Sequence, residues 1–493
     1  MQATQPPILV LWDDSHIWGL MVWRALRALG LPSRLVKGKD IANGGLLGKP
    51  CAGGQTAPLL MAPGGNARLK AQALGEAGRE AVRQWLRTGG RYLGFCGGAG
   101  LALSHARAQD GLHICPWSRG SYPERQQHLI SGHARVRVRS CLIDGTDAES
   151  RPAALDAPAR PDSLRPPLDD AACALVPPRW RGCARAVPPP GRACARRLAP
   201  AADAARADEF PSLPVWWPGR FAPTSDAAVS VLARYHCPDR DFWLADLPLR
   251  HIPAHVLEAW QALYGVNLSA DFLTDQPLMA AGNYGDGRYV LSYSHLETPD
   301  SPDANHWLAH LLRELAGLTP QREEVPAWDL DAPAEAAFWP ASARGPLRAA
   351  LGCVRDVLDL AAEHHLFFRR TPWLWGWKAG LPGGTCNNLH TALHTLACLA
   401  PSPAALSFWQ DCGQRLADLA ALFRAGAEGY LLACRLAEAL APTVPDAVDR
   451  RGLDNQREAV FGHPMRGGGL IEELLLMVEE LIFLSQDEAQ PGV

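Results

Sequence analysis

The sequence predicts an α/β protein with a mostly parallel sheet sandwiched by helices, followed by an all-α C-terminal domain. Short apolar runs alternate with segments of helical periodicity through the first hundred residues, and glycine-rich turns follow several of these runs. From residue 347 onward the apolar residues keep helical spacing. A chain of 493 residues is long enough for two or three domains that each bury a core.

The first predicted elements follow one another in the order strand, helix, strand. Residues 7–12 (PILVLW) predict a buried strand, and residues 19–29 predict a helix. Residues 33–36 can return as a second strand, and residues 75–88 predict a helix that leads into the strand before Cys96. Because this alternation is typical of a parallel sheet covered on both faces, functional groups are expected at the carboxyl ends of the strands.

Cys96 lies where an apolar run turns abruptly into small residues, in YLGFCGGAGLA (residues 92–102). Such a run is typical of a nucleophile elbow, in which a strand turns sharply into a helix and Gly94, Gly97 and Gly98 let the backbones approach. A thiol on that turn is exposed and faces a helix N-terminus, which favours the thiolate. Glycine-rich turns also bind phosphates without doing chemistry, so this pattern has a second interpretation.

A base and its orienting carboxylate are predicted far along the chain. Residues 288–297 (RYVLSYSHLE) predict a strand, and alternation places His295 and Glu297 on one face of an extended segment. The alternative is a polar pair that stabilises the end of the sheet.

An oxyanion hole is predicted from a third segment. Residues 59–66 (LLMAPGGN) predict a strand that runs into a turn with free backbone N–H groups. The amides of Gly64 and Gly65, together with that of Gly97, could hold a negatively charged oxygen.

These motifs together resemble the class I glutamine amidotransferase-like fold, which is flavodoxin-like. The segments WDDSHIW (12–18), GGRYLGFCGGAG (89–100) and SYSHLET (292–298) are similar, more narrowly, to the domain at the N-terminus of eukaryotic biotin-protein ligases. The resemblance covers roughly residues 7–315, with a gap, and implies that Cys96, His295 and Glu297 form a catalytic triad.

The resemblance implies a cysteine-dependent amidotransferase- or amidohydrolase-like protein that transfers an acyl group from an amide or ester carbonyl. Amidotransferases usually carry proline between the histidine and the acid, whereas this chain has Leu296. The alternative function is a non-catalytic ligand-binding or regulatory module that keeps the fold. A third is a free-standing cysteine hydrolase or peptidase in which the helical region restricts access to the site.

Composition excludes several other classes of protein. The formal net charge is −3, which gives no electrostatic case for nucleic acid or an anionic membrane. No signal peptide and no apolar stretch of the ~18 residues that a membrane span requires are found, so a cytoplasmic protein is expected. Thirteen cysteines without regular spacing argue against a disulfide framework.

The expected ligand is a small-molecule substrate, with no cofactor and no metal. The chain has no G-x-x-x-x-G-K-[ST] motif, so any ATP-dependent synthetase or ligase that used its product would be a separate partner. Asp14 and His16 follow the first predicted strand and could contact a ligand, or could cap the following helix. His128 and His133 come without a third ligand, so a metal is not predicted there.

The predicted domains are an α/β domain made of residues 1–150 and 209–318, a linker over 319–346, and a helical domain over 347–493. Residues 151–208 are dominated by alanine, proline, arginine and aspartate, which predicts a disordered insertion or a frameshifted stretch. In the helical domain, three tryptophans within WLWGWKAGLPGG (373–384) either pack in the core or line an apolar pocket.

Overall fold

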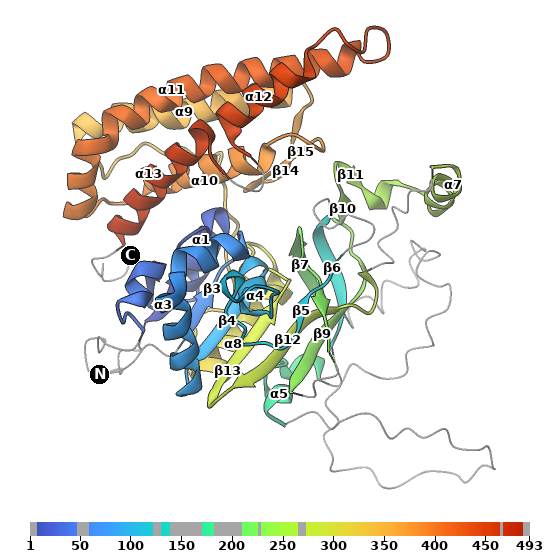
Figure 1. Ribbon diagram of the computed structural model, residues 1–493, viewed down its shortest axis with the longest axis vertical. Helices are drawn as coiled ribbons and strands as arrows, with labels where there is room; N and C mark the ends of the chain where they lie inside the picture. The colour runs from blue at the N-terminus through green and yellow to red at the C-terminus, as the bar shows by residue number, and fades with distance from the viewer. Residues whose placement is uncertain are drawn as a thin grey trace.

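The computed structural model describes residues 7–46, 59–121, 130–138, 170–181, 210–224, 228–264, 273–463 and 467–486. It contains an α/β region and a mainly helical region, stacked against each other (Figure 1). Among the described residues no helix combines the length and apolar character that a membrane crossing requires.

Parallel strands form one half of the main sheet and carry the candidate site. Their spatial order is β13-β4-β3-β1-β2, and every neighbouring pair is parallel. Apolar residues make these strands, and the buried positions are continuous along them, as expected for strands covered on both faces. The bounds are Ile8–Leu11 (β1), Ser33–Val36 (β2), Leu60–Ala62 (β3), Arg91–Phe95 (β4) and Gly287–Ser292 (β13).

The helices between these strands cover both faces of the sheet, with α3 and α4 in front of it and α8 behind it in Figure 1. Helix α3 contains one break, at Gly75, where φ is 61°. The predicted helix over 75–88 is therefore the second part of a longer element. The bounds are His16–Ala28 (α1), Gly38–Ala42 (α2), Ala67–Arg87 (α3), Gly97–Ala102 (α4), Ala108–Asp110 (η1) and Pro302–Ala316 (α8).

Antiparallel strands extend the sheet beyond β13, which the sequence analysis did not anticipate. The order continues β12-β9-β6-β10-β11, and β7 also pairs with β6. The sheet is therefore mixed. The bounds are Ile130–Val138 (β6), Ser212–Trp216 (β7), Val229–Pro238 (β9), Trp243–Leu244 (β10), Leu247–Pro248 (β11), Leu249–His251 (η4), Ala254–Tyr264 (α7) and Pro277–Tyr284 (β12), and Ser118–Arg119 (β5) pairs separately with Phe221–Ala222 (β8).

Part of the segment predicted to be disordered is folded. Within residues 151–208, Asp170–Ala174 form α5 and Pro178–Trp180 form the short helix η3. Trp180 is buried against Trp307 of α8, with ring centroids 5.2 Å apart. Cys173 takes part in a disulfide bond, which the sequence analysis did not expect. The remainder of the segment lies outside the described residues.

The C-terminal region is helical as predicted, and it also contains a β-hairpin. The hairpin, β14 and β15, includes the first part of the tryptophan-rich stretch, for which the sequence analysis predicted no strand. Helix α9 begins inside the range predicted as a linker. The bounds are Ala341–Glu363 (α9), Phe367–Thr371 (β14), Leu374–Trp377 (β15), Gly383–Cys398 (α10), Pro403–Leu440 (α11), Arg450–Phe461 (α12) and Gly469–Ser485 (α13).

Candidate functional site

Cys96 occupies the turn between β4 and α4, at the carboxyl end of a parallel strand. Its backbone has φ 44° and ψ −101°, a conformation that L residues rarely adopt. The next two residues, Gly97 and Gly98, have no room for a side chain. A Cβ at Gly97 would lie 2.0 Å from the Gly65 carbonyl oxygen, and one at Gly98 would lie 1.9 Å from the Ala62 carbonyl oxygen. The sharp strand-to-helix turn predicted from the sequence is present.

The sheet brings the second predicted segment beside this turn. Strand β13 runs parallel to β4 with Ser292 opposite Phe95, and the Cys96 amide donates a 2.7 Å hydrogen bond to the Ser292 carbonyl oxygen. His295 and Glu297 then follow in the loop after β13. Two segments separated by about 200 residues are thus joined at one edge.

His295 and Glu297 form a fully buried pair. The His295 Nδ1 and Glu297 Oε1 atoms are 2.7 Å apart, and both side chains are 0% exposed. The expected extended segment is wrong in one respect: β13 ends at Ser292, and the Thr298 amide bonds the His295 carbonyl oxygen in a turn. The pair is therefore held by a turn instead of strand alternation. Leu296, between them, is buried in the apolar core.

The charges around His295 favour its protonated form. Burial by itself lowers the pKa of His295, but the Glu297 carboxylate and the neighbouring Cys96 side chain outweigh burial and raise that pKa to about 9. The His295 Nε2 and Glu297 Oε2 atoms have no hydrogen-bond partner among the described residues. One ring nitrogen is thus fixed by a carboxylate, and the other remains available on the Cys96 side.

The predicted oxyanion-hole residues lie together. The carbonyl of Gly65 lies against Gly97, as the close approach described above requires, and a Cβ at Gly64 would lie 2.8 Å from the His295 ring. Within the described residues, the amides of Gly64, Gly65 and Gly97 donate no hydrogen bond. Three unused donors therefore surround the turn that carries Cys96.

An aromatic series covers His295 and leads into the helical region. The Trp18 ring lies over His295 with centroids 4.3 Å apart, and Trp217 meets Trp18 edge-on at 6.0 Å. Trp377 of β15 stacks on Trp217 at 5.3 Å. One part of the tryptophan-rich stretch thus forms a wall beside the candidate site.

His16 and Asp14 lie in the loop after β1, as predicted, but His16 is already engaged by a charged partner. Its Nδ1 atom is 2.8 Å from the Glu479 carboxylate of α13. Burial opposes protonation of His16, yet Glu479 holds its pKa above the usual value. Burial also raises the pKa of Asp14, whose carbonyl oxygen lies close to Gly65. His16 therefore joins the two regions of the molecule.

Sequence reasoning missed Lys70, which is completely buried beneath the same loop. Its Nζ atom donates to the Asp13 carbonyl oxygen at 2.7 Å and to the Ser15 hydroxyl at 2.5 Å. Burial lowers the pKa of Lys70 to about 8. Asn66 caps α3 with its side chain, and Lys70 lies one helical turn after it. That spacing is the only feature of the sequence that could have pointed to Lys70.

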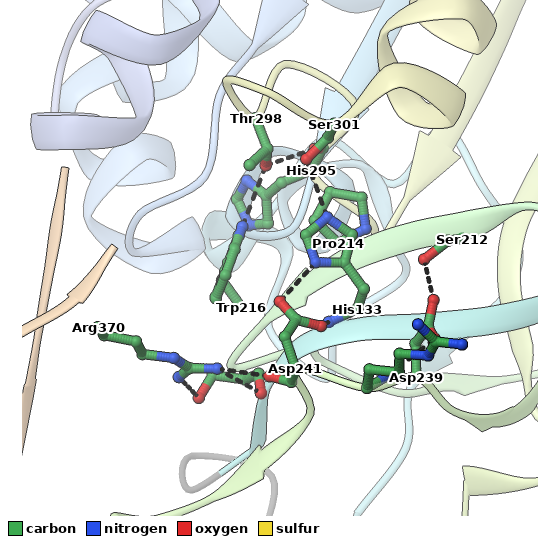
Figure 2. Close-up of polar contacts among 12 residues, drawn as sticks. His133, Ser212, Pro214, Trp216, Asp239, Asp241, His295, Thr298, Ser301 and Arg370 are labelled. Carbon is green, nitrogen blue, oxygen red and sulfur yellow. Dashed lines mark hydrogen bonds and ion pairs between the residues drawn. The ribbon is translucent and has the colours of Figure 1, made fainter. Parts of the chain in front are cut away.

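A second polar group missed by the sequence analysis surrounds His133. Its Nδ1 atom is 2.7 Å from an Asp241 carboxylate oxygen, and its Nε2 atom is 2.9 Å from the Ser301 hydroxyl (Figure 2). Ser301 is only 2% exposed and occupies the N-cap position of α8, although its side chain makes no capping hydrogen bond. This group ties β6 to the loop that follows His295. His128 lies outside the described residues, and no group of three or more metal-ligating side chains occurs among those described.

A parallel α/β sheet with a strained cysteine turn and a buried histidine–carboxylate pair therefore defines the site. Residues 42–111 match the model of a family described as "Biotin-protein ligase, N terminal", which supports a domain of that kind. That match includes Gly64, Gly65, Cys96 and Gly97 but ends well before His295.

Similarity to characterised proteins is slight. No curated protein matches the chain. Among solved structures, a putative ThuA-like protein from Bacteroides uniformis is similar over 64% of this chain and 94% of its own, with 10% identity and a TM-score of 0.30. A TM-score of that size carries no argument about mechanism.

Proposed function

We propose that this chain is a cysteine-dependent, amidotransferase- or amidohydrolase-like enzyme in which Cys96 attacks the carbonyl carbon of an amide or ester. The observation that carries the proposal is the buried His295–Glu297 pair beside a cysteine held in a strained turn. A neutral sheet-stabilising pair would not need a nucleophile elbow at its side.

In the proposed reaction Cys96 and His295 rest as a thiolate–imidazolium pair, in which His295 already holds the proton of the Cys96 thiol, and the thiolate forms a bond to the carbonyl carbon. Glu297 holds this imidazolium, which agrees with its effect on the pKa of His295. The carbonyl π electrons move onto oxygen, where the amides of Gly64, Gly65 and Gly97 stabilise the negative charge. The intermediate then collapses, and the amine or alcohol leaves with the proton from His295.

The thioester that remains is hydrolysed by water, and His295 takes the proton from that water. If the substrate amide is primary, the first product is ammonia. Its use by a synthetase would require a separate protein. The acyl chemistry itself requires only groups that lie around Cys96.

The test is the alkylation rate of Cys96 by iodoacetamide at pH 6, followed for this residue by mass spectrometry. We expect wild type to react at least ~10-fold faster than His295→Gln, because an imidazolium neighbour favours the thiolate. Cys398 is an exposed free thiol and provides an internal control whose rate should not change. Equal Cys96 rates in the two proteins would remove the basis of the proposal.

A non-catalytic ligand-binding module is the second candidate, and one observation favours it. His295 and Glu297 are fully buried, and Trp18 covers the His295 ring. In a module of this kind iodoacetamide would alkylate Cys96 slowly, and the rate would be the same in wild type and in His295→Gln. The same alkylation experiment therefore separates the two functions.

A further inference from the structure

A cavity lies where the helical region meets the antiparallel half of the sheet. Its volume is about 30 Å³. Since one water needs roughly 10–15 Å³ on this scale, the cavity has room for two water-sized groups, which is the size of a carboxylate. The residues that line it are Ser131, Trp217, Ala245, Arg370, Trp375, Gly376, Trp377 and Ala379.

Arg370 is the charged residue in this lining, and among the described residues no carboxylate forms an ion pair with it, although the charge of the nearby Asp241 acts on it. Its Nη2 atom donates to the carbonyl oxygens of Ser131 at 2.8 Å and Asp241 at 3.2 Å, and its Nη1 atom donates to the Ser131 hydroxyl. Figure 2 shows its side chain reaching toward Asp241 from the helical region. These bonds use at most three of the five N–H donors of a guanidinium.

The nearest acidic group is turned to another partner. The two Asp241 carboxylate oxygens accept from the His133 amide at 2.9 Å and lie 2.7 Å from its ring nitrogen. Burial lowers the pKa of Arg370 to about 10, so the guanidinium is still protonated at neutral pH. A protonated guanidinium that forms no ion pair among the described residues therefore lines the cavity, and an anionic ligand would balance its charge.

The rest of the lining suits a planar anion attached to an apolar stem. Trp217 and Trp377 stack to form one wall. The Nε1 atom of the buried Trp375 has no hydrogen-bond partner among the described residues, so it offers a further donor. The guanidinium also lies over the rings of Trp216 and Trp243, with centroids 5.3 and 5.1 Å from it.

We propose that this cavity binds a carboxylate group of a small-molecule ligand, with Arg370 as its principal contact. Trp217 of this wall contacts Trp18, whose ring lies over His295, so one aromatic series joins the cavity to the candidate site. The substrate is then an amide or ester with a carboxylate remote from its reacting carbonyl, and this last step rests on the proposed function.

The experiment titrates the full-length Cys96→Ala protein with adipate and with adipamide by isothermal titration calorimetry. Adipamide has the same length and shape but no charge. We expect adipate to bind at least tenfold more tightly. Equal binding of the two compounds, or no binding of adipate, would overturn the proposal. This test does not depend on a variant of Arg370.

Variants identify the residue responsible. Arg370→Gln should weaken adipate binding at least tenfold, and Arg348→Gln should not, since Arg348 is in the same region but pairs with Glu335 at the surface. Trp375→Phe keeps the charge, removes one donor and should weaken adipate severalfold. Unchanged adipate affinity in folded Arg370→Gln, or in Trp375→Phe when Arg370→Gln does not fold, contradicts the assignment.

Binding in the Cys96→Ala protein is independent of the thiol. Adipate binding together with an unreactive wild-type Cys96 would leave the cavity proposal standing and refute the proposed function. A reactive wild-type Cys96, in a protein that binds adipate no more tightly than adipamide, would leave the proposed function standing and refute the cavity proposal.

Discussion

The backbone of Cys96 stores strain that its surroundings must balance. A positive φ at a residue other than glycine costs on the order of 1–3 kcal/mol and survives where neighbouring structure imposes it. Here β4, α4 and the Gly64–Gly65 turn meet so closely that Gly97 and Gly98 have no room for a side chain. This position was predictable because a cysteine followed by glycines at the carboxyl end of an apolar strand is typical of a sharp strand-to-helix turn.

The pairing of His295 with Glu297 gives a prediction on stability. The pKa of His295 is about 9 in the folded protein, against 6.5 for an exposed imidazole. A raised pKa in a basic group stabilises the fold fully below pH 6.5, and this contribution is lost as the pH rises through 9. Glu297→Gln removes the larger of the two causes of the raised pKa, and the Cys96 side chain remains.

We therefore expect Glu297→Gln to be less stable than wild type below pH 6.5, and this difference in stability to narrow by up to about 3 kcal/mol by pH 9.5, at about 1.4 kcal/mol per pKa unit. Urea denaturation of both proteins at pH 6 and pH 9.5 measures this difference in unfolding free energy. Glu335→Gln is the control, because its surface pair with Arg348 is exposed. A gap that is the same at both pH values would show that His295 is not protonated in the folded state.

At the scale of elements, the sequence predicted the strands that carry the site better than the segments between them. β4 and β13 were recognisable because both are short apolar runs bounded by turns. The turn that holds His295 and Glu297 was not, because alternation cannot show where a strand ends. The β14–β15 hairpin was missed for a related reason: Trp373 and Trp377 pack against Trp216 and Trp217 of the α/β region, and sequence periodicity does not report such contacts.

Helix α5 and η3 show how a segment of low apolar content can still be ordered. The Trp307 Nε1 atom donates to the Leu175 carbonyl oxygen at 3.0 Å, and the His310 ring binds that of Ala174 at 2.7 Å. Trp180 adds a buried ring. The ordering comes from α8, so composition within the segment could not reveal it.

Trp180→Ala should accordingly destabilise the protein by about 3–5 kcal/mol, the usual range for a large aromatic residue removed from a core. Arg179→Ala is the comparison variant, since it keeps the Trp180 ring but removes a partly exposed ion pair with Asp303 and a cation–π contact with that ring, and it should cost less than about 2 kcal/mol. Thermal and urea unfolding measure both. Similar small losses in the two variants would mean that this segment does not dock on α8 in solution.

At the scale of the whole molecule, the helical region closes over the carboxyl ends of the parallel strands. Helix α13 contributes Glu479, which holds His16, and Glu480, which pairs with Lys37. The Trp12 indole N–H also donates to the Glu479 carbonyl oxygen at 3.2 Å. The resemblance to an amidotransferase-like domain could not predict this arrangement, because it covers only the α/β region.

These contacts predict that the helical region controls the size of reagent that reaches Cys96. Replacing both Glu479 and Glu480 by glutamine removes the two ion pairs while preserving side-chain volume. The ratio of Cys96 alkylation by fluorescein maleimide to that by iodoacetamide should rise severalfold at pH 7. Mass spectrometry of the Cys96 peptide gives both rates.

The pH dependence of this ratio follows from His16. Because Glu479 raises the pKa of His16, the ion pair is complete below pH 6.5 and is lost as the pH rises through the raised value. The wild-type ratio should therefore increase with pH, and the double variant should show a high ratio throughout. Glu428→Gln, which removes an ion pair within α11, should behave as wild type. A double variant with the wild-type ratio at every pH would mean that reagents reach Cys96 by a route that α13 does not cover.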